Sequence, residues 1–247
     1  MKILAIGNSF SQDATRYLHK IARAAGEKLT VVNLYIGGCS LERHFRNMHS
    51  EERAYELEIN GERSGFFVSL KEALLNRVWD VITLQQASPS SPKYETYQPY
   101  LNELSAYVRR LCPKARQVIH QTWAYEKDSE RLTGMMKYER PEQMTADIVA
   151  AYAKAATDIG ADAIIPSGEL MAKMLANGME KVHRDTFHAS LGAGRYGLAL
   201  LWYAVLTGKD ISADAFDDFD VAVSPTEREI VIRSVCEILK ERACNVL

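Results

Sequence analysis

The stretch Met1-Lys-Ile-Leu-Ala-Ile-Gly-Asn-Ser-Phe-Ser-Gln-Asp13 decides the fold of this chain. Its apolar residues 3–6 predict a short buried strand that ends at Gly7. A helical pattern begins near Asp13, so Ser9 lies where the strand turns into a helix. Ligands of open α/β sheets bind beyond the carboxyl ends of the strands. With a base and an oxyanion site nearby, the Ser9 hydroxyl could act as a nucleophile.

Strand-like and helix-like patterns alternate along the rest of the chain. Further apolar or β-branched runs predict four more strands, which cover residues 29–36, 80–84, 117–119 and 162–165. Apolar residues with helical spacing follow each of these strands. Alternation of this kind is typical of a parallel sheet with helices on both faces. We expect one domain over residues 1–247, a three-layer α/β/α sandwich around a five-stranded parallel sheet.

Two segments interrupt this alternation. Residues 55–68 alternate apolar and polar side chains around Asn60-Gly61, a strong turn signal, and predict an inserted β-hairpin that either covers the site or packs at a sheet edge. Residues 124–140 are polar and aromatic and predict a loop or lid.

The composition is that of an ordinary globular protein, with 47% hydrophobic and 25% charged residues. A net charge of −2 does not indicate a nucleic-acid or anionic-membrane partner. No stretch approaches the roughly 20 apolar residues of a membrane span, and residues 3–6 are too few for a signal peptide. The spacing of the four cysteines indicates free thiols in a reducing compartment. We expect a cytoplasmic protein, although a chain trimmed of a leader would look the same.

Residues with useful chemistry follow the predicted strands at their carboxyl ends. Because parallel strands bring these ends to one edge of the sheet, we expect the residues to meet in one crevice. They are Gly37-Gly38, Gln85-Gln86, His120-Gln121-Thr122-Trp123 and, before a long apolar helix, His183-Arg-Asp185-Thr-Phe-His188.

A serine hydroxyl is a weak nucleophile and needs a base. His188 suits this role because imidazole ordinarily titrates near neutral pH, and Asp185 lies three residues earlier, where a helical turn would set the two side by side. A carboxylate there would hold the tautomer and stabilise the imidazolium. His183 is a rival base. A metal site of His183, Asp185 and His188 is a weaker alternative, because no ligand elsewhere completes it convincingly.

An oxyanion site needs donors aimed at the place where negative charge develops. The candidates are the backbone N–H groups of Ser9 and Gly38 and a side-chain amide from Gln85 or Gln86. Glycine lets the backbone approach a ligand closely. Two buried amides at one strand end must be hydrogen-bonded, which suggests a purpose, and we favour Gln85 slightly as the donor.

The block Gly7-Asn8-Ser9-Phe10 resembles the Gly-Asp-Ser-Leu block of the SGNH (GDSL-type) hydrolases, with Asn8 where Asp is commoner. Gly38 is similar to their second block, and Asp185-Thr-Phe-His188 resembles their late Asp-x-x-His block. Their usual Gly-x-Asn-Asp block is replaced by Gln85-Gln86-Ala87-Ser88, so the asparagine that donates to the oxyanion is absent. The resemblance covers the whole chain and indicates a divergent bacterial branch with a flavodoxin-like SGNH fold.

The resemblance implies ester hydrolysis by acyl transfer, with no metal or organic cofactor. Ser9 would be the nucleophile, His188 the base and then the acid, and Asp185 the residue that orients it. Asn8 would brace the turn, and Asn8 and Trp123 would contact the substrate.

The expected substrate is a small-molecule ester, preferably an acetylated sugar, because Trp123, Tyr125 and Tyr138 suggest a polar, aromatic lining. A lysophospholipase or thioesterase of the same mechanism is one alternative. A non-catalytic carbohydrate-binding module on the same scaffold is another.

Overall fold

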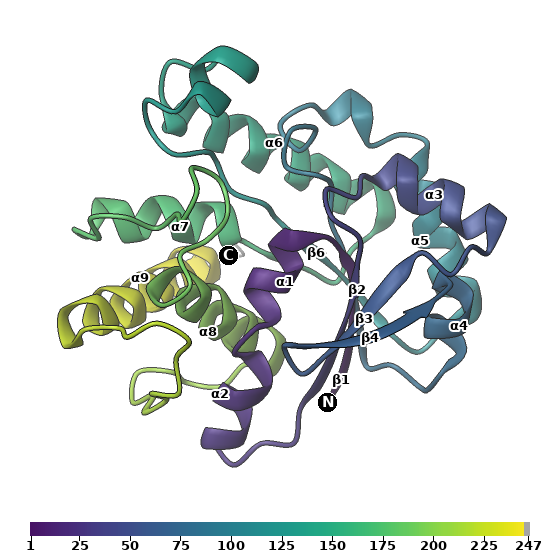
Figure 1. Ribbon diagram of the computed structural model, residues 1–247, viewed down its shortest axis with the longest axis horizontal. Helices are drawn as coiled ribbons and strands as arrows, with labels where there is room; N and C mark the ends of the chain where they lie inside the picture. Colours follow the sequence, from purple (N-terminus) through teal and green to yellow (C-terminus); the bar gives the residue numbers. More distant parts are fainter. Residues whose placement is uncertain (245–247) are drawn as a thin grey trace.

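The structure, a computed structural model, describes residues 1–244. A seven-stranded sheet forms the middle layer, in the order β4-β3-β2-β1-β5-β6-β7, with helices on both faces (Figure 1). The strands are β1 (Lys2–Gly7), β2 (Thr30–Tyr35), β3 (Tyr55–Ile59), β4 (Glu62–Val68), β5 (Val81–Leu84), β6 (Arg116–His120) and β7 (Ala163–Ile165). Strand β1 lies between β2 and β5 and is parallel to both.

The helices form two layers. On one side, α8 packs against α1, α2, α7 and α9; on the other, α5 packs against α3, α4 and α6 (Figure 1). Their bounds are α1 (Ser9–Thr15), α2 (Leu18–Ala24), α3 (Leu41–Ser50), α4 (Leu70–Leu75), α5 (Tyr100–Leu111), α6 (Pro141–Ile159), α7 (Ser167–Ala176), α8 (Ala193–Thr207) and α9 (Pro225–Cys244). Among residues 1–244, no helix is long and apolar enough to cross a membrane.

Strand β1 is the centre of the core. Residues 3–6 are at most 1% exposed because helices cover both faces of this strand. The strand ends at Gly7, where a Cβ atom would lie 2.4 Å from Ser11 Oγ and 2.9 Å from the side-chain Cδ of Gln85. Glycine is therefore required for the turn that leads to Ser9.

The hairpin corrects the expected five-stranded sheet. Strands β3 and β4 are antiparallel and continue the sheet beyond β2, with Val32 paired to Ile59, so the sheet has seven strands and is not wholly parallel. The five parallel strands are the ones that the sequence predicts. Of the two placements considered for the hairpin, the structure shows the sheet edge.

Two predicted helices begin or end differently. The first starts at Ser9 rather than near Asp13, because Asn8 Oδ1 accepts a hydrogen bond from the N–H of Phe10 at 3.0 Å and so caps α1. It breaks between α1 and α2. The helical spacing that follows the strand at residues 80–84 predicts a helix over 94–111, and the structure confirms it only from Tyr100, after a short 3₁₀ turn, η1 (Tyr94–Thr96), and a proline at position 99.

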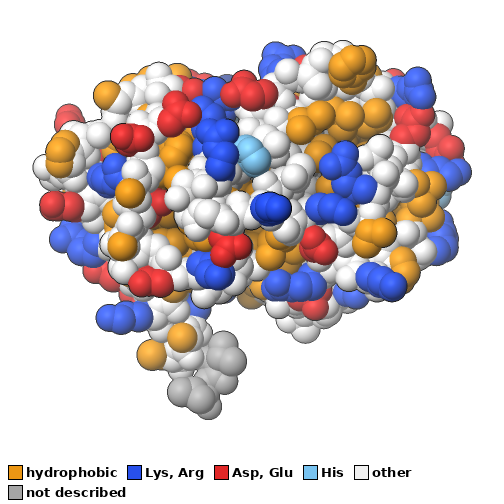
Figure 2. All heavy atoms as spheres, turned by 90° about the horizontal axis from the view of Figure 1, so that it is seen from below, with side chains coloured by type: hydrophobic (Ala, Val, Ile, Leu, Met, Phe, Trp, Pro, Cys, Tyr) orange, Lys and Arg blue, Asp and Glu red, His pale blue; other side chains and the backbone are white. Residues whose placement is uncertain are grey.

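The segment 124–140, called the lid below, contains one π-helical turn, η2 (Arg131–Met135), and lies at the top of the molecule above α6 in Figure 1. The opposite face, seen from below, carries acidic and basic side chains interspersed with one another (Figure 2).

Candidate active site

Three of the residues singled out from the sequence form a continuous hydrogen-bonded series. Ser9 Oγ lies 2.8 Å from His188 Nε2, and His188 Nδ1 lies 2.8 Å from Asp185 Oδ2. The backbone N–H of His188 also donates to Asp185 Oδ1, at 2.9 Å. In this arrangement the imidazole can accept the serine proton while the carboxylate holds its other nitrogen.

The Asp185 carboxylate is held in its charged form. Burial alone raises its pKa, but hydrogen bonds from the side chain and backbone N–H of His188 outweigh burial, so the net pKa is lowered. The two residues lie on an irregular loop rather than on the helical turn that their spacing suggested. Thr186 between them has a φ of 73°, and its carbonyl accepts the N–H of Glu126 at 2.7 Å, which ties this loop to the lid.

Asp13 positions this loop, and sequence reasoning gave it no role. It is fully buried one helical turn after Ser9. Its carboxylate accepts hydrogen bonds from Arg184 Nη1 at 2.9 Å, from Arg195 Nε at 2.8 Å and from the N–H of Ala189 at 3.1 Å. The signal was available in the sequence: an aspartate four residues before Tyr17 lies on the apolar face of the helix.

A chain of neutral polar groups supports the Ser9 turn from below. Asn8 Nδ2 donates to the carbonyl of Cys39 at 3.0 Å, and Gln85 Nε2 donates to Asn8 Oδ1 at 2.7 Å. His120 Nδ1 lies 2.7 Å from Gln85 Oε1, and its Nε2 lies 3.1 Å from Ser167 Oγ. Burial lowers the pKa of His120 to about 3, so its ring is neutral. Asn8 is placed as a brace for the turn, and it also lines the cavity at Ser9.

The two glutamines correct the expected source of the third oxyanion donor. Gln86 Oε1 accepts the N–H groups of Leu41 and Ala87, both at 2.9 Å, while its Nε2 donates to the carbonyl of Thr96 at 3.0 Å. Gln85 is occupied by the polar chain below the turn. Neither side chain lines the cavity at Ser9 among the described residues, because each satisfies buried groups nearby.

The cavity at Ser9 has a volume of about 410 Å³. Residues from strand ends, the lid and the His188 loop line it, among them Ser9, Gly38, Ser88, Tyr125, Arg131 and His188. Gly38 has a φ of 63°, and a Cβ there would meet no atom within 4 Å. Backbone conformation rather than space therefore favours glycine at this position.

Ser88 was given no role by the sequence, and it lines the cavity that neither glutamine side chain lines. Its Oγ lies 2.9 Å from the Tyr125 hydroxyl, and both residues line the cavity. Burial raises the pKa of Tyr125, so its hydroxyl keeps its proton and can donate to Ser88.

Trp123 corrects a second expectation. Its side chain is fully buried, stacks on Phe10 with ring centroids 4.1 Å apart, and donates from Nε1 to the carbonyl of Phe187 at 2.7 Å. It supports the wall of the cavity and does not reach its interior. Tyr138 also lies outside the lining and donates to Asp147 Oδ2 at 2.7 Å.

His183 does not line this cavity. Its Nε2 lies 3.0 Å from the carbonyl oxygen of Ala124, to which it donates, and burial lowers its pKa. In the part of the chain that the structure describes, no group of three or more His, Cys, Asp or Glu side chains is placed to hold a metal ion.

The chain shares the fold of solved lipases and esterases of the SGNH (GDSL) type, from which its sequence has diverged. The chain belongs to the DUF4886 family, described as a domain of unknown function, whose model matches residues 2–231.

A solved DUF4886 family protein from Bacteroides uniformis ATCC 8492 is 33% identical, with a TM-score of 0.89 over 97% of this chain and 94% of that one.

Two more distant structures share the fold. TesA is 14% identical with a TM-score of 0.55, over 84% of this chain and 99% of its own. Axe2, an acetylxylan esterase from Geobacillus stearothermophilus, is 14% identical with a TM-score of 0.56, over 83% of this chain and 94% of its own. A comparison of the sequence with curated proteins finds no match.

Proposed function

We propose that this protein is a serine esterase that hydrolyses small acyl esters. The observation that carries the proposal is the series Ser9–His188–Asp185, with both side-chain distances at 2.8 Å, at the edge of a cavity. A serine held in this way has its base within reach, and the base has its own orienting carboxylate.

The chemistry has two steps. His188 Nε2 takes the proton of Ser9 Oγ as this oxygen attacks the ester carbonyl carbon, and the resulting imidazolium protonates the leaving alcohol as its C–O bond breaks. Water then attacks the acyl-enzyme with His188 again as the base. The attacking oxygen becomes part of the released carboxylic acid, and the proton returns to Ser9.

The oxyanion would be held by three donors at the cavity. The backbone N–H groups of Ser9 and Gly38 remain from the sequence-based prediction, and the Ser88 hydroxyl replaces the glutamine amide. With Tyr125 donating to Ser88 Oγ, the Ser88 proton is available for the oxyanion.

An acetyl ester of a sugar remains the preferred substrate. Tyr125, Tyr35 and Gln12 all line the cavity, and such polar and aromatic groups suit a sugar. The structural neighbour Axe2 is described as an acetylxylan esterase.

The cysteines among residues 1–244 form no disulfide, which supports a cytoplasmic location.

A second cavity favours a long-chain alternative, a lysophospholipase or thioesterase. It has a volume of about 830 Å³, and Met171, Leu175, Val182 and Ile238 are among its lining residues. Tyr125 lines both cavities, so an acyl chain could extend from one toward the other if this side chain moved. A series of 4-nitrophenyl esters from acetate to palmitate decides between the two, since the preferred function requires the highest kcat/KM for acetate.

The deciding experiment tests Ser9 itself. Ser9→Ala and His188→Ala should each abolish hydrolysis of 4-nitrophenyl acetate, and a fluorophosphonate probe should label the unmodified protein but not Ser9→Ala. Ser50→Ala, at an exposed position, is the matched control and should behave as the unmodified protein. Full activity in Ser9→Ala would exclude the mechanism. An unlabelled Ser9 in a protein that binds carbohydrate would point to a binding module instead.

A further inference from the structure

Arg131 brings a guanidinium from the lid into the Ser9 cavity. Its Cζ lies 3.9 Å from the centroid of the Phe187 ring, and that ring lies 3.8 Å from the imidazole of His188, centroid to centroid. A cation, an aromatic ring and the proposed base therefore follow one another along one wall of the cavity.

The charge of Arg131 is not balanced within the cavity. No Asp or Glu side chain belongs to the described lining, whose cationic members are Arg131 and Arg184. Arg184 is neutralised by Asp13 at 2.9 Å, whereas Arg131 has no carboxylate within 4.0 Å in residues 1–244. Arg131 is partly buried, and a partly desolvated cation without a partner attracts an anion more strongly than an exposed one does.

The position of Arg131 indicates which part of an ester would carry that anion. In the proposed mechanism His188 protonates the leaving alcohol, so the alcohol portion must lie beside the imidazole. Phe187 contacts that imidazole, and Arg131 contacts Phe187, so the guanidinium is within reach of a group attached to the alcohol portion. A planar guanidinium donates two parallel hydrogen bonds to a carboxylate, which makes a carboxylate the best-matched group.

We propose that Arg131 binds a carboxylate on the alcohol portion of the substrate, so that the substrate is an acyl ester of an acidic alcohol, such as an acidic sugar. This inference rests on the proposed esterase function and narrows its substrate class.

A matched pair of esters tests it: 3-acetoxybenzoate, which is anionic, and 3-acetoxybenzamide, its neutral counterpart, followed by release of acetate. The unmodified protein should show the higher kcat/KM for the anionic ester. Arg131→Gln should lower the ratio of the two kcat/KM values by roughly tenfold, mainly through KM, because a charge-assisted hydrogen bond is lost. Arg131→Lys should recover part of the ratio, and the preference should fall as ionic strength rises.

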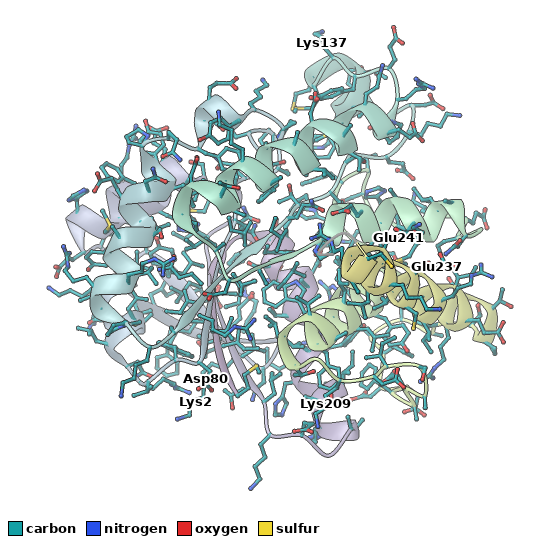
Figure 3. All side chains as sticks on the ribbon, turned by 180° about the vertical axis from the view of Figure 1, so that it is seen from behind. Lys2, Asp80, Lys137, Lys209, Glu237 and Glu241 are labelled. Carbon is teal, nitrogen blue, oxygen red and sulfur yellow. The ribbon has the colours of Figure 1, made fainter. Side chains whose placement is uncertain are left out.

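Lys137→Gln is the control for net charge in the lid. Lys137 is exposed, does not line the cavity, and lies at the outer edge of the molecule in Figure 3. The ratio of the two kcat/KM values in Lys137→Gln should therefore match that of the unmodified protein. Equal kcat/KM values for the two esters, or a ratio unchanged in Arg131→Gln, would overturn the anion site and leave the esterase intact. A protein that hydrolyses neither ester and whose Ser9 resists the fluorophosphonate would overturn the esterase function itself.

Discussion

Both carboxylate oxygens of Asp13 lie 2.9 Å from Nη1 of Arg184, across 171 positions of sequence. Asp13 belongs to the helix that begins at Ser9, and Arg184 directly precedes Asp185. The contact therefore joins the helix of the proposed nucleophile to the loop of the proposed base. Because Asp13 is fully buried, protein groups rather than water supply the hydrogen bonds of its carboxylate.

Replacing Asp13 with Asn should damage both stability and catalysis. The change keeps the shape but leaves Arg184 and Arg195 without their shared counter-ion, so we expect the free energy of unfolding in urea to fall by about 3 kcal/mol. Loosening of the loop should lower kcat at least tenfold with a smaller change in KM, and should slow labelling of Ser9 in the folded protein.

Asp218→Asn is the control for Asp13→Asn, because Asp218 forms an ion pair with Lys20 but its side chain is 64% exposed. Asp218→Asn should change neither the free energy of unfolding nor kcat measurably. A normal kcat in a folded Asp13→Asn protein would contradict the positioning role.

Removing the Ser88 hydroxyl should lower kcat. If this group donates to the oxyanion, Ser88→Ala should reduce kcat by about 10²- to 10³-fold with little change in KM. Tyr125→Phe, which leaves Ser88 without its 2.9 Å partner, should have a smaller effect. Undiminished kcat in Ser88→Ala would mean that only the two backbone N–H groups donate to the oxyanion.

Gln86→Ala should instead lower the urea midpoint, since the Gln86 amide forms hydrogen bonds with backbone groups that hold the structure together.

Stability should fall as the pH drops below neutrality. Burial lowers the pKa values of His44 and His120 to about 3 in the folded chain, whereas an unfolded histidine titrates near pH 6.5. As the pH falls below about 6.5, these two histidines bind protons in the unfolded state but stay neutral in the folded state, so unfolding becomes more favourable. Urea midpoints measured from about pH 7 to pH 5 should show this decline. His120→Gln should flatten it, and an unchanged slope in that variant would contradict the assignment.

Two glycines of the hairpin form a matched pair. Gly61 and Gly65 both have positive φ, at 86° and 71°, so alanine at either position carries a similar backbone cost. At Gly61 a Cβ would also lie 2.2 Å from the carbonyl oxygen of Arg16, whereas at Gly65 it would meet nothing within 4 Å. Gly61→Ala should therefore lower the melting temperature more than Gly65→Ala. Equal shifts would mean that the hairpin does not dock tightly on the α1–α2 connection.

Periodicity and strand-end chemistry were sufficient to predict the five parallel strands and to single out Ser9, Asp185 and His188. Apolar runs fix which segments are buried, and the parallel arrangement brings their ends together. The same local information could not show that β3 pairs with β2, because an alternating strand suits a sheet edge or a separate cover equally well.

Contacts between distant residues account for what the sequence left open. Whether Gln85 or Gln86 faces the cavity depends on the N–H of Leu41 and the carbonyl of Thr96, which occupy Gln86. Trp123 could equally have been a sugar platform, and its stacking on Phe10 is what buries it. The partner of Asp13 was also beyond reach, since local pattern does not specify contacts between such distant positions.

The polar chain under the Ser9 turn runs in one direction, from Ser167 through His120 and Gln85 to Asn8. Each member donates to the next, so reversing any one amide would set two donors or two acceptors face to face. The hydrogen bonds of this chain therefore fix the orientation of each amide group and the tautomer of the His120 ring. Because position 8 is asparagine rather than aspartate, the chain carries no charge. The electric field that its dipoles exert at Ser9 therefore stays constant across the pH range in which histidine bases work.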